Sequence, residues 1–221
     1  MVGRTGKEAG AVSVSAVVLA AGRATRMGGQ KVLLPLGGRS VVQWVVDAAL
    51  GSRAAETIVV VGHEAGMVTE ALEDRPVTVV VNPDHAQGMS TSVQAGIRAI
   101  HPSCDAAVFL LGDQPFVSSA LVDQLIDRFA ETSKWVVRPL VGDHPVHPVL
   151  MSAALFAEIL DQRGDVGGRE IARRHPGQLC LVPVDDPRLD LDIDTSEDYE
   201  TALQMEGRST ERTRENAREK Q

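Results

Sequence analysis

Short runs rich in valine alternate along this chain with segments that carry a helical pattern of apolar residues. The runs lie at residues 14–20, 57–62, 77–82 and 106–113, and the helical segments at 41–50, 64–72, 90–100 and 118–130. Strands that alternate with helices of about ten residues are typical of βαβ units, whose strands form a mostly parallel sheet covered by helices. The sequence therefore predicts an α/β fold with three layers, α/β/α.

The second half of the chain is less regular, but it continues the same domain. Its expected strands are 135–139, 147–151 and 178–184, and its expected helices are 153–160 and 196–203, the last capped by Thr195 or Ser196. No linker or repeat divides the 221 residues. We expect one domain over residues 12–205, a flexible arm at 1–11 and a charged, disordered tail at 206–221, where no apolar face is visible.

Composition narrows the class of protein. A net charge of −8 argues against a nucleic-acid partner, which would need a basic face. No stretch reaches the roughly 18 apolar residues of a membrane span, so no membrane partner is expected. Cys104 and Cys180 show no metal-binding spacing. The apolar run near the N-terminus continues into a glycine-rich loop rather than a cleavage site, so we expect a cytoplasmic protein.

That loop lies in "VVLAAGRATRMGGQK", residues 17–31. A glycine loop between a strand and a helix can direct backbone N–H groups at phosphate. The Walker A pattern fails, because Lys31 follows Gln30 and precedes Val32, and the G-x-G-x-x-G fingerprint fails as well. The loop therefore supports neither a P-loop ATPase nor a standard NAD site. Taken alone, it could also be an ordinary surface loop.

Carboxylates stand at two further places. Asp113 in "FLLGDQPFV" follows a strand and would reach the carboxyl edge of the sheet, where ligands of α/β proteins bind. In "LDLDIDTSEDY", Asp192 and Asp194 alternate, so in an extended segment both would point to one face, and Asp190 continues the alternation. Converging carboxylates suit Mg²⁺, which prefers oxygen ligands. The alternatives are a helix cap at Asp113 and a solvated acidic turn at 189–199.

Two more segments are weaker candidates. "NPDHAQGMSTSVQAGI", residues 82–97, opens a helix with hydroxyl side chains that could hold a phosphate or a base edge, or could simply cap the helix. "RPLVGDHPVHPVL", residues 138–150, carries Arg138 and His147, and His147 could equally belong to the core or to a turn.

The order of these motifs resembles a known family. "LAAGRATRMGGQK" fits L-A-[AG]-G-x-x-x-R-[ML]-G-x-x-K, the signature loop of nucleotidyltransferases. Within them the chain most resembles the MobA-like or MocA-like NTP transferases, the molybdenum cofactor cytidylyltransferase group, over about residues 14–205. The resemblance implies a Rossmann-like sheet of the nucleotidyltransferase, GT-A-like type.

The resemblance also implies roles for individual residues. Arg26, Lys31 and Asp113 would be catalytic, and Asp113, Asp192 and Asp194 would hold Mg²⁺, with Asp190 as a rival ligand. Arg138, His147, Gly164 and Asp165 would face the acceptor, although Val146 replaces a glycine that the family commonly shows. The nucleotide-binding residues would be Leu19, Ala20, Ala21, Gly22, Arg26, Gly28, Lys31, Asn82, Gly88, Ser90, Ser92 and Asp113.

The implied reaction is Mg²⁺-dependent transfer of a nucleotidyl group onto a phosphorylated acceptor, with release of pyrophosphate. Related guanylyltransferases commonly have glycine where this chain has Ala21, which favours CTP, and the implied acceptor is molybdopterin or the molybdenum cofactor. A molybdenum-containing dehydrogenase is a further candidate partner. Three alternatives stay open: a transferase that uses GTP or another small phosphorylated acceptor, a non-catalytic carrier or chaperone of the cofactor, and, more remotely, a redox enzyme.

Overall fold

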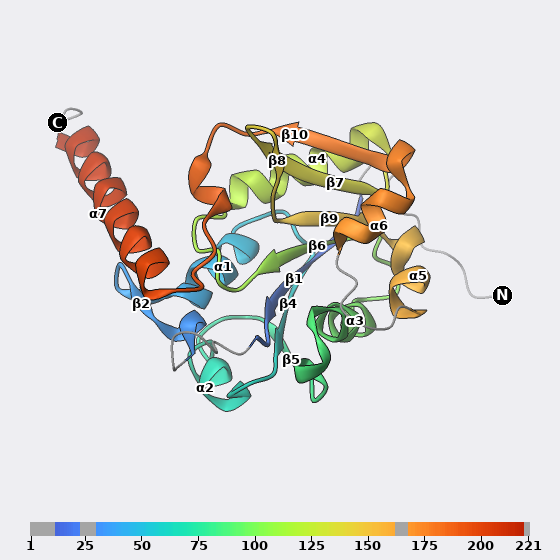
Figure 1. Cartoon of the computed structure of the whole chain (residues 1–221), viewed down its shortest axis with the longest axis horizontal. Coiled ribbons are helices and arrows are strands. Elements are labelled where there is room, and N and C mark those ends of the chain that lie inside the picture. Colours follow the sequence, from blue (N-terminus) through green and yellow to red (C-terminus); the bar gives the residue numbers. More distant parts are fainter. Residues whose placement is uncertain (1–11, 23–29, 162–167, 219–221) are drawn as a thin grey trace.

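Eight strands form one mixed sheet at the centre of the computed structural model, which describes residues 12–22, 30–161 and 168–218 (Figure 1). The strands are β1 (Val14–Ala20), β4 (Glu56–Val61), β5 (Thr78–Val81), β6 (Ala106–Leu111), β7 (Val136–Val141), β8 (His144–Pro145), β9 (Val149–Ser152) and β10 (Leu179–Pro183). The order is β10-β7-β9-β6-β1-β4-β5, and β8 pairs with β7. The pairs β1–β4, β1–β6, β4–β5 and β7–β10 are parallel, and β9 runs antiparallel to both neighbours. The predicted mostly parallel α/β sheet is confirmed.

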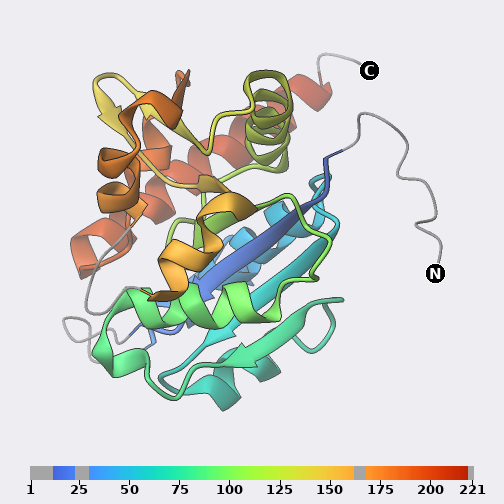
Figure 2. The same cartoon turned by 90° about the vertical axis from the view of Figure 1, so that its right-hand side faces the viewer.

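Helices cover both faces of this sheet, as the three-layer prediction requires. Against one face lie α1 (Val41–Leu50), α2 (Ala65–Glu70) and α4 (Ser119–Thr132), and against the other lie α3 (Met89–Ala99), α5 (Phe156–Asp161) and α6 (Gly168–Arg174). Figure 2 shows α3, in green, lying across the face of the sheet that is turned toward the viewer. A small hairpin of β2 (Pro35–Leu36) and β3 (Arg39–Ser40) precedes α1. Short 3-10 helices complete the chain: η1 (Lys31–Leu33), η2 (His85–Gln87), η3 (Ala153–Leu155), η4 (Pro176–Gln178) and η5 (Pro187–Asp190).

The alternation of side chains along β1 divides the core between the two faces. Ala16 and Val18 pack with α1 and α4, while Val17 packs on the opposite face with α3. Because β1 is covered on both sides, it needs apolar residues at most successive positions, which explains its run of valine, alanine and leucine with Ser15 as the one polar residue.

The order of strands reverses next to β1. After β1 the chain moves to β4 and β5 on one side and then returns to place β6 on the other side. In open α/β sheets, ligands bind at such a switch point, beyond the carboxyl ends of the strands. Gly112 lies there, and it allows close approach: its N–H donates to the Leu19 carbonyl at 2.9 Å, and a Cβ atom at position 112 would stand 3.0 Å from that same oxygen.

The C-terminal segment corrects one prediction. The last helix, α7 (Ser196–Arg218), does not end near residue 203 as expected but continues to Arg218. The continuation contains no proline and is rich in glutamate and arginine, which are good helix formers, so it extends the helix without an apolar face. In Figure 1, α7 leads away from the sheet. Within the described residues, α7 and the other helices lack the combination of length and apolar character that a membrane span requires.

Gly96 tests how tightly α3 packs on the sheet. A Cβ atom at this position would lie 2.5 Å from Cγ1 of the fully buried Val17. Replacing a helical glycine by alanine normally gains up to about 1 kcal/mol, but overpacking costs about 1–3 kcal/mol. We therefore expect Gly96→Ala to lower the free energy of unfolding by about 1–2 kcal/mol, measured by urea denaturation. In the matched Gly66→Ala variant of α2, the new methyl meets nothing within 4 Å, so that variant should be as stable as the wild type or more so. Equal stability of wild type and Gly96→Ala would contradict the tight packing.

Candidate active site

Two cavities lie side by side beyond the carboxyl ends of β1 and β6. We call the larger, of about 400 Å³, the Lys31 cavity, and the smaller, of about 220 Å³, the Phe109 cavity. Leu19 and Met89 line both, so they form the shared wall. Predicted nucleotide-binding residues line the larger cavity: Leu19, Ala20, Ala21, Gly22, Lys31, Gly88, Ser92 and Asp113. The structure therefore brings together the ends of strands and the start of α3 that the sequence motifs had singled out.

The centre of the Lys31 cavity is an ammonium group between two carboxylates. Lys31 Nζ lies 2.5 Å from Asp113 Oδ2 and 2.5 Å from Asp194 Oδ1. The Lys31 and Asp113 side chains are largely buried, with exposed fractions of 13% and 19%, whereas the Asp194 side chain is about half exposed. Removing Lys31 would leave two neighbouring carboxylates without their shared cation, which is far costlier than losing an exposed ion pair.

The pKa of Lys31 reflects this balance. Burial alone would lower the pKa of its ammonium group, but the charge and hydrogen bond of Asp113, aided by Asp194, outweigh burial and raise it. Lys31 is therefore a permanent cation in the physiological range. It can offset negative charge that enters the cavity.

Asp194 is held at the site by the start of α7. The Ile193 N–H donates to the Asp113 carbonyl at 3.2 Å, which ties this segment to the end of β6. The N–H groups of Asp194 and Thr195 donate to Asp198, whose own N–H donates back to the Thr195 hydroxyl at 3.2 Å. Thr195 is therefore the capping residue of α7, one of the two that the sequence suggested.

The donor set fits a magnesium ion only in part. Asp113 and Asp194 each direct one carboxylate oxygen at the same ammonium group, and Mg²⁺ in nucleotide enzymes is commonly held by one or two carboxylates together with phosphate oxygens and water. The three-ligand set expected from the sequence is not assembled: among the residues that the structure describes, no group of three His, Cys, Asp or Glu side chains could hold a metal. Asp192 instead accepts a hydrogen bond from Gln114 Nε2 at 2.5 Å.

Asp192 has an unfavourable electrostatic position. Loss of hydration inside the site, followed by the negative charge of Asp113, raises the pKa of its carboxyl, although solvent reaches part of the side chain. The hydrogen bond from Gln114 and the charge of Lys31 offset this effect only partly. Asp192 and Asp190 both line the Phe109 cavity rather than the Lys31 cavity.

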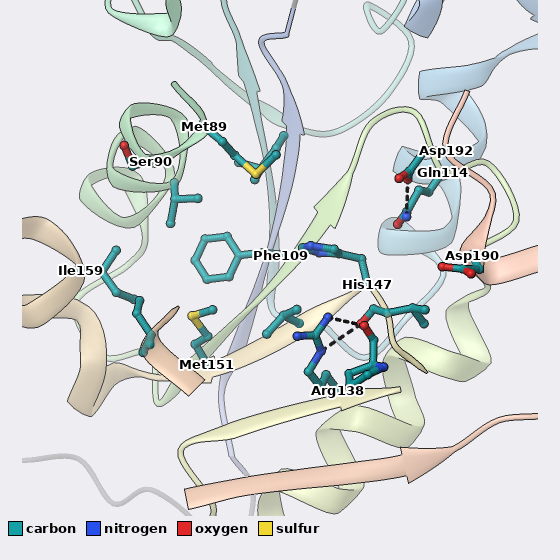
Figure 3. A pocket seen from close by; sticks show the side chains of 16 residues that line it. Met89, Ser90, Phe109, Gln114, Arg138, His147, Met151, Ile159, Asp190 and Asp192 are labelled. Carbon is teal, nitrogen blue, oxygen red and sulfur yellow. Dashed lines mark hydrogen bonds between the residues drawn. The ribbon is translucent and has the colours of Figure 1, made fainter. Parts of the chain in front are cut away.

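The predicted acceptor residues Arg138 and His147 line the Phe109 cavity (Figure 3). Arg138 is buried, and its guanidinium donates to the carbonyls of Pro145 at 2.7 Å and Val146 at 3.3 Å. In Figure 3 the His147 ring projects toward Phe109. Arg138 therefore supports the backbone beside the cavity, which sequence reasoning did not anticipate, and its contact with an acceptor remains a prediction.

Asn82 serves the site indirectly. Its amide is buried, and Nδ2 donates to Thr91 Oγ1 at 2.9 Å and to Ser92 Oγ at 3.0 Å, while Oδ1 accepts from the Asp84 N–H. Asn82 lines neither cavity. It joins the end of β5 to the start of α3 and so positions Ser92, which lines the Lys31 cavity. Ser90 lines the Phe109 cavity instead.

Four predicted residues lie outside the described ranges: Arg26, Gly28, Gly164 and Asp165. Their assigned roles remain predictions. The structure adds residues that the sequence reasoning missed. His85 lines the Lys31 cavity, and Gln114 lines the Phe109 cavity. Each of these two residues lies within a motif that the sequence analysis had identified. The sequence alone did not show which cavity the residue would line.

Comparisons of the sequence and the fold with known proteins agree with a nucleotide site at this edge of the sheet. The fold and site define a nucleotidyltransferase. The model of the MobA-like NTP transferase domain matches residues 16–179, and the chain belongs to this family.

Two relatives illustrate the range of the family. The chain is 32% identical to the nicotine blue oxidoreductase of Paenarthrobacter nicotinovorans, over 83% of this chain and 93% of that protein. It is 26% identical to the molybdenum cofactor cytidylyltransferase of Escherichia coli strain K12, over 86% of this chain and 95% of the relative.

Solved structures show the same fold. Rv0371c from Mycobacterium tuberculosis H37Rv superposes with a TM-score of 0.80 at 30% identity, over 88% of this chain and 98% of that one. A second structure of Rv0371c, a complex with manganese, superposes with a TM-score of 0.75 at 29% identity, over 87% of this chain and 99% of that one. A divalent metal therefore accompanies at least one structural relative.

The raised pKa of Asp192 leads to a pH-dependent stability. A carboxyl whose pKa is higher in the folded state favours folding while protonated, and this contribution is lost as the pH rises from about 3.8 through the raised value. Asp192→Asn keeps an oxygen that can accept from Gln114 but carries no charge. We expect this variant to unfold at a higher temperature than the wild type at pH 7 without metal, by about 1–3 °C because solvent screens the charge.

The difference should shrink toward pH 4. The measurement is thermal unfolding followed by circular dichroism at both pH values, with the exposed Asp185→Asn variant as a control for loss of charge alone. A lower unfolding midpoint for Asp192→Asn at pH 7 would show that the carboxylate is not destabilising.

Proposed function

We propose that this protein transfers a nucleotidyl group, CMP from CTP, onto a phosphorylated acceptor of the molybdopterin type with Mg²⁺ as cofactor. The observation that carries the proposal is the contact between the two cavities. One contains a cation and a carboxylate suited to a metal and a triphosphate, and the other is a separate recess behind the shared wall of Leu19 and Met89. Such a pair of sites suits a reaction between two small molecules that must meet at their phosphates.

The chemistry is an in-line displacement. An oxygen of the acceptor phosphate attacks the α-phosphorus of the nucleotide, a new P–O bond forms, and the bond to pyrophosphate breaks. Positioning and neutralisation of charge supply most of the catalysis in phosphoryl and nucleotidyl transfer. Lys31 would exchange a carboxylate for phosphate oxygens when the nucleotide binds, since its ammonium group already stands in the cavity.

The acidic residues of the Lys31 cavity would bind the metal ion. Asp113 and Asp194 would bind Mg²⁺, which supplies positive charge to the phosphate oxygens when it is present. Without the ion, Lys31 keeps these two carboxylates together. The same three residues can thus remain close to one another in the free and the loaded protein.

The preference for CTP depends on the end of β1. Ala21 is 3% exposed and lines the Lys31 cavity. Gly62 and His85 stand against it, because a Cβ atom at position 62 would lie 2.9 Å from Ala21 Cβ and 2.6 Å from His85 Cβ. The methyl group of Ala21 is therefore part of a close-packed wall of the cavity. Because this wall cannot shift to make room for a larger purine base, it favours the smaller pyrimidine base.

Two other functions of the same site are supported by specific observations. GTP or another small phosphorylated acceptor would fit the same cation and carboxylates. The similarity to a nicotine blue oxidoreductase is the observation behind the redox alternative, which would require a separate electron donor as co-substrate. A non-catalytic carrier that hands the cofactor to a molybdenum dehydrogenase would not require Lys31 between two carboxylates, so the geometry favours an enzyme.

Pyrophosphate release tests the reaction directly. The protein is incubated with Mg²⁺ and each nucleoside triphosphate, with and without molybdopterin, and pyrophosphate is measured. We expect release with CTP that requires the acceptor. Asp113→Asn should reduce the rate by at least about 10²-fold, because it removes one anionic ligand without a change in volume. The control Asp185→Asn should keep the wild-type rate. Full activity of a folded Asp113→Asn protein would remove Asp113 from the site.

Ala21→Gly tests the choice of base. Removing one methyl group from the wall should shift the ratio of kcat/KM for CTP over GTP toward GTP by about tenfold at most, because a single apolar contact discriminates weakly. The values are measured for both nucleotides in wild type and variant. Ala86→Gly, a change of the same size on the exposed wall of the same cavity, should leave the ratio unchanged. A wild type that already prefers GTP would contradict the cytidylyl assignment.

A further inference from the structure

Three successive backbone N–H groups hold the segment that carries Asp194. The Ile193 N–H donates to the Asp113 carbonyl at 3.2 Å. The N–H groups of Asp194 and Thr195 both donate to Asp198 Oδ2, at 3.2 Å and 2.7 Å. The Ile193 side chain is fully buried, which anchors the segment further. The backbone of Asp194 is therefore tied to the protein on both sides.

Asp198 accepts more hydrogen bonds than a helix cap requires. In a capping box, the side chain of the third helical residue accepts from the N–H of the capping residue, whose own side chain accepts from the N–H of that third residue. Thr195 and Asp198 make both of these bonds, at 2.7 Å and 3.2 Å. Asp198 Oδ2 also accepts from the Thr195 hydroxyl at 2.7 Å and from the Asp194 N–H. The last of these bonds extends the box to the residue whose carboxylate contacts Lys31.

Asp198 acts on this segment as a charged acceptor. The hydrogen bond from the Thr195 side chain lowers the pKa of the Asp198 carboxyl most, and the backbone N–H groups of Thr195 and Asp194 lower it further, although loss of hydration opposes them. The carboxyl is therefore ionised at neutral pH, and hydrogen bonds to an ionised acceptor are stronger than those between neutral groups. Asp198 lines neither cavity, so its influence on a ligand there passes through Asp194.

Packing does not fix the direction of the Asp194 carboxylate, because 49% of the side chain is exposed. In this structure Asp194 Oδ1 contacts the Lys31 ammonium group at 2.5 Å. In the proposed reaction, Lys31 would exchange a carboxylate for phosphate oxygens when the nucleotide binds. The direction of the Asp194 carboxylate would then depend on the backbone that Asp198 holds.

We propose that Asp198 is a positioning residue for the metal ligand Asp194. By holding the N–H groups of Asp194 and Thr195, it fixes the backbone from which the Asp194 carboxylate reaches the place that it shares with Asp113. The inference rests on the proposed function in one respect, that Asp194 binds the divalent metal. Residues that orient metal ligands through hydrogen bonds typically contribute about 10–100-fold to metal affinity or activity.

Mn²⁺ binding tests the inference without a transfer reaction. Mn²⁺ suits the same oxygen ligands as Mg²⁺, and its unbound form is quantified by electron paramagnetic resonance. Binding of Mn²⁺ to the full chain is measured without nucleotide, and binding of CTP is measured by calorimetry with and without Mn²⁺, in both cases without an acceptor. We call the gain in CTP affinity that Mn²⁺ provides the metal effect.

We expect Asp198→Ala to reduce the metal effect by about tenfold or more, because the Asp194 carboxylate loses its fixed direction. Without nucleotide, Mn²⁺ binding should weaken by a smaller factor, because Lys31 still holds Asp194 there. The affinity for CTP without metal should be unchanged, since Asp198 lines neither cavity.

Three further variants separate positioning from stability and charge. Asp198→Asn keeps an oxygen that can accept from the same N–H groups, and it should lose only a few-fold of the metal effect. Ser118→Ala removes the side-chain cap of α4, where Ser118 Oγ accepts from the Leu121 N–H at 3.2 Å, and Glu197→Gln removes the neighbouring exposed carboxylate of α7. Neither Ser118 nor Glu197 lines either cavity, so both variants should keep the wild-type metal effect even where the unfolding temperature falls. Circular dichroism during heating records folding and the unfolding temperature of each variant.

An unchanged metal effect in folded Asp198→Ala would overturn the inference, and so would an equal loss in Ser118→Ala or Glu197→Gln. No binding of Mn²⁺ by the wild type, with or without CTP, would overturn it too. If Asp198→Ala does not fold, Asp198→Asn decides: a metal effect weaker than that of Glu197→Gln supports the inference, and an equal one overturns it.

These outcomes differ from failure of the proposed function. Weaker Mn²⁺ binding in Asp198→Ala, without pyrophosphate release by the wild type, would keep the positioning role and reject nucleotidyl transfer. Pyrophosphate release by the wild type, with an unchanged metal effect in folded Asp198→Ala, would reject only the role of Asp198.

Discussion

The ammonium group of Lys31, held between Asp113 and Asp194, is the interaction on which the site depends. It joins three segments that are far apart in the sequence: the 3-10 helix after the glycine-rich loop, the end of β6 and the start of α7. Without a shared cation the two carboxylates would repel each other, and the α7 segment would lose a contact with the sheet. The cation needed for phosphate chemistry is thus also the group that holds the acidic residues in place.

The same electrostatics explain why the acidic segment after η5 is not uniform. Asp194 has Lys31 as a partner, whereas Asp192 meets the charge of Asp113 with only partial compensation and has a raised pKa. A sequence selected for stability alone would not place a carboxylate there. An unfavourable charge beside a cavity is a common feature of functional sites, because the ligand provides the compensation that the protein lacks. Asp192 and Gln114, which line the Phe109 cavity and share a hydrogen bond, therefore mark this cavity as part of the candidate site.

Much of the fold could be predicted from the sequence, because strands that are buried on both faces are apolar at nearly every position. The valine-rich runs predicted β1, β4, β5 and β6, and the motif order located Lys31 and Asp113 at one edge of the sheet. The different contacts and cavities of Asp190, Asp192 and Asp194 could not be predicted. Alternation along an extended segment says that side chains share a face, but the segment is irregular, and partners 78 and 163 positions away decide where two of them point. The length of α7 was missed for a related reason, since an absent apolar face does not prevent a helix made of good helix formers.

The two cavities differ in the charged groups that line them, and this difference would affect which ligands each can bind. Asp113 and Gln114 are consecutive, yet the first lines the Lys31 cavity and the second lines the Phe109 cavity, because the chain turns sharply after β6. In the proposed reaction, a triphosphate would be attracted to the cavity that holds the Lys31 ammonium group, and the carboxylates of Asp190 and Asp192 would repel it from the other cavity. The turn after β6 thereby places two consecutive side chains in different cavities, and Leu19 and Met89 form the apolar wall between these cavities.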